Sequence, residues 1–170
     1  MYINCSLEEA KEKLKNSLSY ERYIHSLGTM EMAMELAKRF GCDEEKAQIA
    51  GLLHDCAKCL SNDELKEFEN TFSDCEKLSY KTWHAPAGVV VAQRDFGVSD
   101  EEILSSIRWH TIGKVNMSDF EKIIFLADKI EKRTREIEFR EKIETVLDET
   151  NSLDEAMFKS FKITIKSLLK

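Results

Sequence analysis

This 170-residue chain is expected to form an all-α fold of about eight helices. One proline and six glycines are too few for a loop-rich β fold, and no two segments alternate as paired strands would. A serine followed three residues later by a glutamate is the capping box that begins an α-helix. This signal occurs at Ser6/Glu9, Ser61/Glu64, Ser99/Glu102, Ser118/Glu121 and Ser152/Glu155.

Glycine and aspartate mark the boundary between two further helices. A helix over about 20–40 is expected to stop at Gly41, because glycine readily adopts the left-handed conformation that ends a helix. Asp43 can cap the next helix, which we expect to run from Glu44 to about Ala57.

Proline and glycine bound the helices of the second half. Pro86 suits the first turn of a helix that runs to about Phe96 and ends at Gly97. Gly113 is expected to close the helix that carries His110. The last segment has an apolar stripe at helical spacing, which predicts a contact with the core or with a second copy in a homodimer. The stripe comprises Leu153, Met157, Phe161, Ile165 and Leu168.

Composition limits the class of protein. With 42% apolar and 34% charged residues, the chain fits one domain over residues 1–170, in which helices over 135–170 pack on a motif core at 20–131. Purely apolar stretches such as Val89 to Ala92 are too short to cross a membrane. The first residues carry no recognisable secretory signal, so we expect a cytoplasmic protein. The net charge of −7 argues against nucleic acid as a partner, but not against a small phosphorylated ligand.

Five cysteines in a chain without an export signal favour reduced thiols. Cys56 and Cys59 form a CxxC, but no second CxxC is present to complete a zinc site. We therefore interpret them as two packing thiols rather than as a redox or metal pair.

The histidines carry the strongest functional signal. Imidazole nitrogens and carboxylate oxygens together are ligands that divalent transition metals accept. The chain has four histidines in all, and they fall in an ordered series with two aspartates: His25, His54-Asp55, His84, His110 and Asp128. We interpret the series as one metal site built from several helices.

Two basic residues are placed to accompany this site. Arg22 lies one turn before His25, so both side chains leave the same face of a helix. Lys58 lies three residues after Asp55, where its ammonium could hold a phosphate oxygen.

The local strings around these residues resemble a known family. The order His…His-Asp…His…His…Asp on a helical scaffold resembles the HD-domain metal-dependent phosphohydrolases. The similarity is closest to the YqeK family of bacterial diadenosine tetraphosphatases, and it runs from about Tyr20 to Glu131. The strings that carry it are RYIHSLG (22–28), GLLHDCAK (51–58), HAPAG (84–88), RWHTIG (108–113) and EKIIFLADKIE (121–131).

The resemblance implies that a dinucleoside tetraphosphate is cleaved at its centre into two nucleoside diphosphates by metal-activated water. It implies iron as the metal, while the ligand types also suit manganese, cobalt or zinc, as one or two ions. It assigns metal binding to His25, His54, Asp55 and Asp128. It places Lys58, His84, His110 and Thr111 around the phosphates. Our mechanistic hypothesis assigns catalysis to Asp55, Lys58, His84 and His110, and adds Arg22 to the substrate-binding residues. Whether His84 and His110 bind phosphates or a second metal stays open at this stage.

The chain departs from the family pattern after Glu131. The family usually continues with Pro-Asn-Arg, whereas Lys132-Arg133-Thr134-Arg135 follows here, so that Thr134 holds the position of the family arginine. Arg133 or Arg135 could supply the phosphate contact, and we take Arg133 as the first candidate.

Three alternatives use the same residues. The site could hydrolyse nucleoside monophosphates, cyclic nucleotides or guanosine polyphosphates instead. The chain could be a sensor that binds nucleotide or metal without catalysis. It could also be an oxygen-carrying di-iron bundle, although the local strings do not fit that class.

Overall fold

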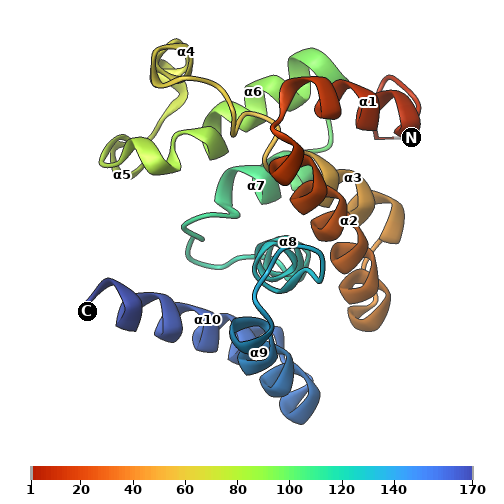
Figure 1. Cartoon of the computed structure of the whole chain (residues 1–170), viewed down its shortest axis with the longest axis vertical. Helices are drawn as coiled ribbons and strands as arrows, with labels where there is room; N and C mark the ends of the chain where they lie inside the picture. The colour runs from red at the N-terminus through yellow and green to blue at the C-terminus, as the bar shows by residue number, and fades with distance from the viewer. Residues whose placement is uncertain (1, 170) are drawn as a thin grey trace.

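Over residues 2–169, the part of the chain that the computed structural model describes, every regular element is a helix and no strand occurs (Figure 1). This confirms the predicted all-α fold. The elements in chain order are α1 (Leu7–Ser17), α2 (Tyr20–Phe40), α3 (Glu44–Leu53), α4 (Asn62–Lys66), the 3-10 helix η1 (Glu69–Thr71), α5 (Asp74–Lys77), the 3-10 helix η2 (Tyr80–Thr82), α6 (His84–Phe96), α7 (Glu101–Trp109), α8 (Asp119–Ile130), α9 (Ile137–Thr150) and α10 (Leu153–Leu168).

The described residues form ten α-helices rather than about eight, because the connection between α3 and α6 contains two short ones. The predicted box at Ser61 begins α4. A further capping box, between Ser73 and Glu76, begins α5 and was not among the predicted ones. Both helices are about one turn long, which is too short to show helical periodicity in the sequence.

Side-chain caps begin the longer helices largely where the sequence predicted them. Ser6, Ser118 and Ser152 each accept the backbone N–H of the glutamate three residues later. The exception is α7, which Asp100 caps in place of Ser99. The Asp100 carboxylate accepts two backbone N–H groups, each at 3.0 Å, so it satisfies more of the free amides at the helix start.

Helix α3 ends at Leu53, earlier than the predicted end near Ala57. From this point the amides bond to the carbonyl three residues back, with Cys56 N 3.0 Å from Leu53 O and Lys58 N 2.9 Å from Asp55 O. Such tight turns replace the regular helix. His54 and Asp55 therefore lie in a turn at the end of α3, where both side chains face the same interior space.

A glycine allows α2 and α3 to approach closely. A Cβ on Gly51 would lie 2.9 Å from Met30 Cα and 2.9 Å from Thr29 O, both backbone atoms of α2. Because backbone cannot move aside as a flexible side chain can, only glycine fits at this crossing. The crossing brings together the two segments that carry His25 and His54.

Helix α8 occupies the centre of the fold. It packs against α2, α3 and α7 on one side and against α9 and α10 on the other (Figure 1). Its side chains Ile123, Ile124 and Leu126 are fully buried. Asp128, near its C-terminal end, is thereby held deep in the molecule.

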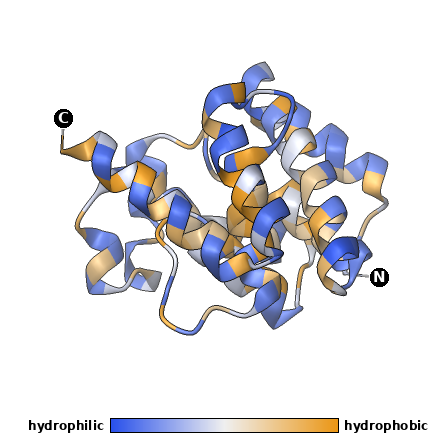
Figure 2. Ribbon diagram, turned by 90° about the horizontal axis from the view of Figure 1, so that it is seen from below, coloured by the Kyte–Doolittle hydropathy of each residue, from blue (hydrophilic) through white to orange (hydrophobic). Residues whose placement is uncertain are grey.

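The C-terminal apolar stripe divides into a buried and an exposed half. Leu153 and Met157 belong to the core, and the Phe161 ring packs 5.2 Å from that of Phe125. Ile165 is 55% exposed and Leu168 is 79% exposed. Hydrophobic residues continue toward the C-terminus between hydrophilic ones (Figure 2). Among residues 2–169, no helix is both long enough and apolar enough to span a membrane.

The five cysteines, all among the described residues, are free thiols. Cys56 is buried and its Sγ donates to Gly88 O at 3.4 Å, as expected of a packing thiol. Cys59 differs from that expectation, because it is exposed and its Sγ accepts the Ser19 N–H at 3.4 Å.

Candidate metal centre

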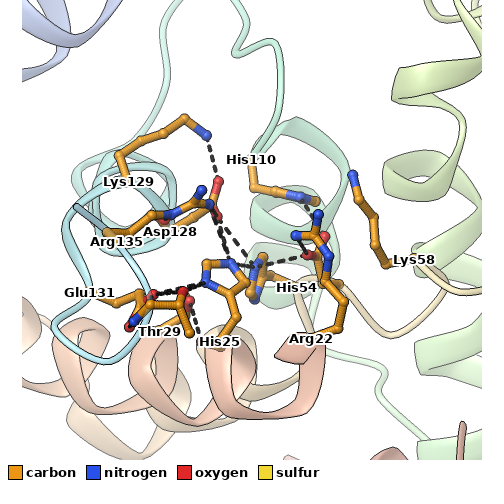
Figure 3. Close-up of polar contacts among 12 residues, drawn as sticks. Arg22, His25, Thr29, His54, Lys58, His110, Asp128, Lys129, Glu131 and Arg135 are labelled. Atoms are coloured by element: carbon orange, nitrogen blue, oxygen red, sulfur yellow. Dashed lines mark hydrogen bonds and ion pairs between the residues drawn. The ribbon is translucent and has the colours of Figure 1, made fainter. Parts of the chain in front are cut away.

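The six side chains of the predicted series meet in one buried cluster, part of which is drawn in Figure 3. Each of them is at most 5% exposed. They come from five segments: His25 from α2, His54 and Asp55 from the turn after α3, His84 from the first position of α6, His110 from the C-terminal end of α7, and Asp128 from α8. His84 is the first residue of α6, two positions before Pro86, which the sequence placed in the first turn of this helix.

One half of the cluster brings three ligand atoms together. His25 Nε2 lies 2.9 Å from Asp128 Oδ1 and 3.2 Å from His54 Nε2. His54 Nε2 lies 3.6 Å from the same Asp128 oxygen. Two nitrogens and one carboxylate oxygen at these separations can bind a single divalent ion.

Asp55 connects this half to the other. Its Oδ2 lies 3.7 Å from His54 Nε2, and its Oδ1 lies 3.3 Å from the Nε2 atoms of both His84 and His110. His54, Asp55 and His110 form a second group of potential ligands. The two carboxylate oxygens of Asp55 thus face different sets of imidazoles.

Hydrogen bonds to the far side of the rings fit these histidines to metal binding. His54 Nδ1 donates to Gly51 O at 2.7 Å, and His110 Nδ1 donates to Ile107 O at 2.6 Å. A proton fixed on Nδ1 leaves the Nε2 lone pair free to face the cluster. Several inward lone pairs beside buried carboxylates are the arrangement that a cation satisfies, so the residues present fit a divalent metal.

The charges of the cluster follow from burial and neighbours. Burial alone would raise the pKa values of Asp55 and Asp128, but nearby histidines and Lys129 outweigh it and hold both well below their ordinary value. Burial lowers the pKa of His54 below its ordinary value and that of His84 to about 4. Asp55 and Asp128 are therefore anionic and His54 and His84 neutral, which are the protonation states that bind metals. Burial would lower the pKa of His25, but its hydrogen bonds to Asp128 and Glu131 outweigh burial and raise the pKa above its ordinary value.

Glu131 is a member of the site that the sequence analysis missed. It is fully buried, and its Oε1 lies 3.1 Å from His25 Nδ1. Burial would raise the pKa of Glu131, but the hydrogen bonds from His25, from Thr134 and from the Arg133 backbone outweigh it and lower the pKa to about 2. One signal could have found it, since Glu131 follows Asp128 by three residues and so extends the same helix face.

Four basic side chains surround the cluster. Lys58 Nζ lies 3.3 Å from His84 Nε2, and Arg22 Nη1 lies 3.5 Å from Asp55 Oδ2. On the other side, Lys129 Nζ pairs with Asp128 Oδ2. Figure 3 shows Lys58 and Lys129 on opposite sides of His54. Thr111 also lies at the site, with its Oγ1 3.2 Å from His110 Nε2.

The fourth basic residue is Arg135, and it replaces our first candidate. Arg133 does not reach the cluster, because its guanidinium pairs with Glu31 at 2.6 Å on the outer side of α2. Arg135 Nη2 lies 2.6 Å from Asp128 Oδ1. Glu131 explains the difference, since it accepts the Arg133 backbone N–H and turns the chain sharply after α8.

Comparison with known sequences agrees with this geometry. Residues 22–133, which include all the clustered histidines and aspartates, match the HD domain. The chain belongs to the HD-domain family. The resemblance predicted from the sequence is thereby confirmed. Membership of this family implies a divalent metal, and the matched residues include groups that could hold one.

Relatives within this family are similar over nearly the whole chain. The chain is 40% identical over 169 residues to the symmetrical bis(5'-nucleosyl)-tetraphosphatase of Bacillus subtilis (strain 168), covering 96% of this chain and 88% of that protein. The protein of the same name from Staphylococcus aureus (strain NCTC 8325 / PS 47) is 32% identical over 168 residues, covering 97% of this chain and 86% of that one.

A solved structure shares the fold. It is the crystal structure of a predicted HD superfamily hydrolase involved in NAD metabolism from Clostridium acetobutylicum. The two chains superpose with a TM-score of 0.89 and 38% sequence identity, over 97% of this chain and 88% of the other.

Proposed function

We propose that this HD-domain protein hydrolyses diadenosine tetraphosphate symmetrically and releases two molecules of ADP. The observation that carries the proposal is the convergence of six ligand-type side chains with basic residues on both sides of them. Relatives named for this reaction match nearly the whole chain, at 40% identity for the one from Bacillus subtilis.

The metal that we propose is iron, with manganese, cobalt or zinc as the alternatives that the same ligands suit. When bound, a divalent metal lowers the pKa of a water ligand to near 7 and polarises a phosphoryl oxygen. His25, His54, Asp55 and Asp128 would hold it. The position of Asp55 between two sets of imidazoles favours a second ion, for which His110 would be a ligand.

The basic side chains hold the phosphates in this proposal. Phosphoryl transfer depends mainly on positioning and on neutralising charge. Lys58 and Arg22 lie beside Asp55 and His84, and Arg135 lies beside Asp128. Among them, Arg135 takes the place of the Arg133 contact expected from the sequence.

His84 is the residue that we assign to the leaving diphosphate. The proton of His110 is fixed on Nδ1 by Ile107 O, so that ring presents only a lone pair to the site. His84 instead contacts side chains, with Lys58 Nζ 3.3 Å from its Nδ1 and Thr111 Oγ1 3.4 Å from its Nε2. His84, Lys58 and Thr111 can thus hold the departing diphosphate by hydrogen bonds.

The test is anaerobic purification, elemental analysis and a time course on diadenosine tetraphosphate resolved by chromatography. Wild-type protein should release two ADP per substrate, and Asp55→Ala should lose bound metal together with more than about 100-fold of activity, because metal catalysis supplies several kcal/mol. Asp63→Ala is the control, since its side chain is 97% exposed. Full turnover by Asp55→Ala, with circular dichroism unchanged, would contradict the mechanism.

The products separate the alternatives. Free phosphate or adenosine would indicate a nucleotidase. Turnover of a cyclic nucleotide or guanosine polyphosphate, with no turnover of diadenosine tetraphosphate, would assign that other nucleotide as the substrate. Nucleotide binding by the metal-loaded protein without turnover would favour a sensor. A visible oxo-bridge absorption band without phosphatase activity would favour the oxygen-carrying di-iron class.

Four further expectations from the sequence accompany this proposal. Residues 1–170 are proposed to act as one domain, because α9 and α10 pack on the helix that carries Asp128. The exposed half of the α10 stripe supports a homodimer. A cytoplasmic location and the lack of nucleic-acid binding remain predictions from composition and from a net charge of −7.

A further inference from the structure

Two separate cavities adjoin the metal cluster. Lys58 and His84 line the first, and Lys129 and Arg135 line the second. The first, here called the Tyr80 pocket, has a volume of about 340 Å³ and is lined by Lys58, Leu60, Asn62, Leu65, Tyr80, Lys81 and His84. The second, here called the Phe139 pocket, measures ≈ 380 Å³ and is lined by Lys129, Thr134, Arg135, Glu136 and Phe139. Both volumes lie in the range of small-molecule sites.

The Tyr80 pocket has the chemistry of a nucleoside site. Tyr80 is 56% exposed, so its ring is available for a base to stack on. Leu65 is buried and gives the pocket an apolar wall, while Asn62 offers an amide that can donate and accept. Lys81 adds a second positive charge to that of Lys58.

The Phe139 pocket repeats this combination with different residues. It joins one aromatic ring, Phe139, to two cations, Lys129 and Arg135. Both cations pair with Asp128 at the cluster and also line the pocket. A phosphate bound by them beside Asp128 would therefore lie next to the pocket. Glu136 is exposed and can accept hydrogen bonds from ribose hydroxyls.

The two pockets lie on opposite sides of the cluster. Lys58 and the pair Lys129 and Arg135 flank His54 from opposite directions (Figure 3). In the whole fold, the α5–α6 connection lies toward one end and α9 toward the other, with α8 between them (Figure 1). A ligand with a nucleoside at each end and phosphates in the middle matches this layout.

We infer that the two pockets each receive one nucleoside of a dinucleoside polyphosphate, with Tyr80 and Phe139 as the stacking residues. The inference rests on the proposed function and explains its symmetry. A substrate held by both ends places its central phosphoanhydride at the cluster, and this position yields two nucleoside diphosphates. Specificity for two nucleosides then depends on Tyr80 and Phe139, neither of which is among the clustered histidines and aspartates.

The experiment measures binding separately from turnover. The probe is diadenosine tetraphosphate with a methylene group in place of the central bridging oxygen, titrated by calorimetry into metal-loaded protein. Tyr80→Ala and Phe139→Leu should each weaken binding about 10-fold, since one base loses its stacking partner. The double variant should lose about 100-fold, because distant sites add. Phe139→Leu keeps an apolar side chain where Phe139 packs against the core.

Two controls make the result specific. Phe158→Ala removes an aromatic ring that is 61% exposed on α10 and lines neither pocket, so it should leave affinity unchanged. Adenosine tetraphosphate with the same methylene group has one nucleoside and should bind wild-type protein about 10-fold more weakly than the full probe. The double variant should bind both probes equally.

Each outcome decides a different point. If either single variant binds the full probe as tightly as wild type does, that pocket holds no nucleoside and the inference is wrong. Cleavage of diadenosine tetraphosphate by wild-type protein would still stand in that case. If wild type binds the probe through both rings but does not cleave the natural substrate, the inference holds and the proposed function fails.

Discussion

The carboxylate of Glu131 occupies the space beside Gly28 that any other residue would fill with a side chain. A Cβ on Gly28 would lie 2.1 Å from Glu131 Oε2 and 3.2 Å from Arg133 Cβ. The other oxygen, Oε1, bonds to His25 Nδ1 at 3.1 Å. Helix α2 therefore supplies the His25 imidazole and also, at Gly28, the space through which the Glu131 carboxylate reaches that imidazole.

Gly28→Ala should weaken metal binding about 10- to 100-fold, because displacing Glu131 frees the His25 ring. Glu131→Gln should have an effect of the same size while keeping the side-chain shape. Metal content after dialysis against a competing chelator measures both.

Gly41→Ala serves as the matched control for the glycine substitution. Gly41 has a φ of +71° and no atom within 4 Å of the Cβ position, so alanine there costs about 1 kcal/mol of stability through backbone strain alone. Its metal affinity should equal that of wild type. Wild-type affinity in Gly28→Ala would mean that Glu131 does not orient His25.

The sequence predicted the fold well where a local signal determined the structure. Serine and aspartate caps, and the glycines at positions 41 and 97 in the left-handed region, depend only on neighbouring residues. The end of α3 could not be predicted in this way. The turn after Leu53 depends on how His54 and Asp55 meet side chains from α2, α7 and α8, which are distant in the sequence.

The metal-ligand residues of the site could be predicted from the sequence, whereas the residues placed by the path of the chain could not. The order of histidines and aspartates identified the six clustered side chains, since their chemistry is visible in the sequence. The sequence narrowed the arginine to Arg133 or Arg135, and the choice between them needed the path of the chain after α8. Lys129 could not be chosen among many basic residues. Glu131 was missed because composition does not distinguish a buried carboxylate from a surface one, and only its three-residue spacing from Asp128 pointed to it.

Arg135 and Arg133 provide a paired test of the phosphate contact. Arg135→Ala should raise the KM for diadenosine tetraphosphate about 10-fold or more, because a charge-assisted contact contributes about 1.5–3 kcal/mol. Arg133→Ala removes an arginine two positions away whose guanidinium pairs with Glu31 at the surface. The KM of Arg133→Ala should stay within a factor of two of the wild-type value, because the Arg133–Glu31 ion pair contacts no clustered side chain. Exposed ion pairs also contribute only about 0–1 kcal/mol to stability, so the fold should be unaffected.

Steady-state kinetics with saturating metal separates this contact from a metal effect. Arg135→Ala should keep its metal content, since Arg135 binds the carboxylate of Asp128 rather than an ion. An increase in KM for Arg133→Ala with none for Arg135→Ala would restore the assignment made from the sequence.

The pair between Glu76 and Arg108 makes stability depend on pH away from the metal centre. Glu76 is 1% exposed and receives two hydrogen bonds from the Arg108 guanidinium, at 2.7 and 3.0 Å. Burial would raise the pKa of Glu76, but the bonds from Arg108 and from Ser73 outweigh it, and the pKa falls below its ordinary value of 4.5. A lowered folded-state pKa stabilises the fold above the unfolded value, and this contribution is lost as pH falls through the folded-state value.

Glu76→Gln should therefore lower the free energy of unfolding by about 1–3 kcal/mol at pH 7, where the wild-type carboxylate is ionised and paired. The difference between the two proteins should shrink as the pH falls below 4.5, the ordinary value, and through the lowered folded-state pKa, because the wild-type group becomes protonated. Urea unfolding of metal-free protein at several pH values measures it. Glu67→Gln, at an exposed position, should follow the wild-type curve. A constant difference between Glu76→Gln and wild type across this range would mean that the carboxylate contributes through shape alone, without its charge.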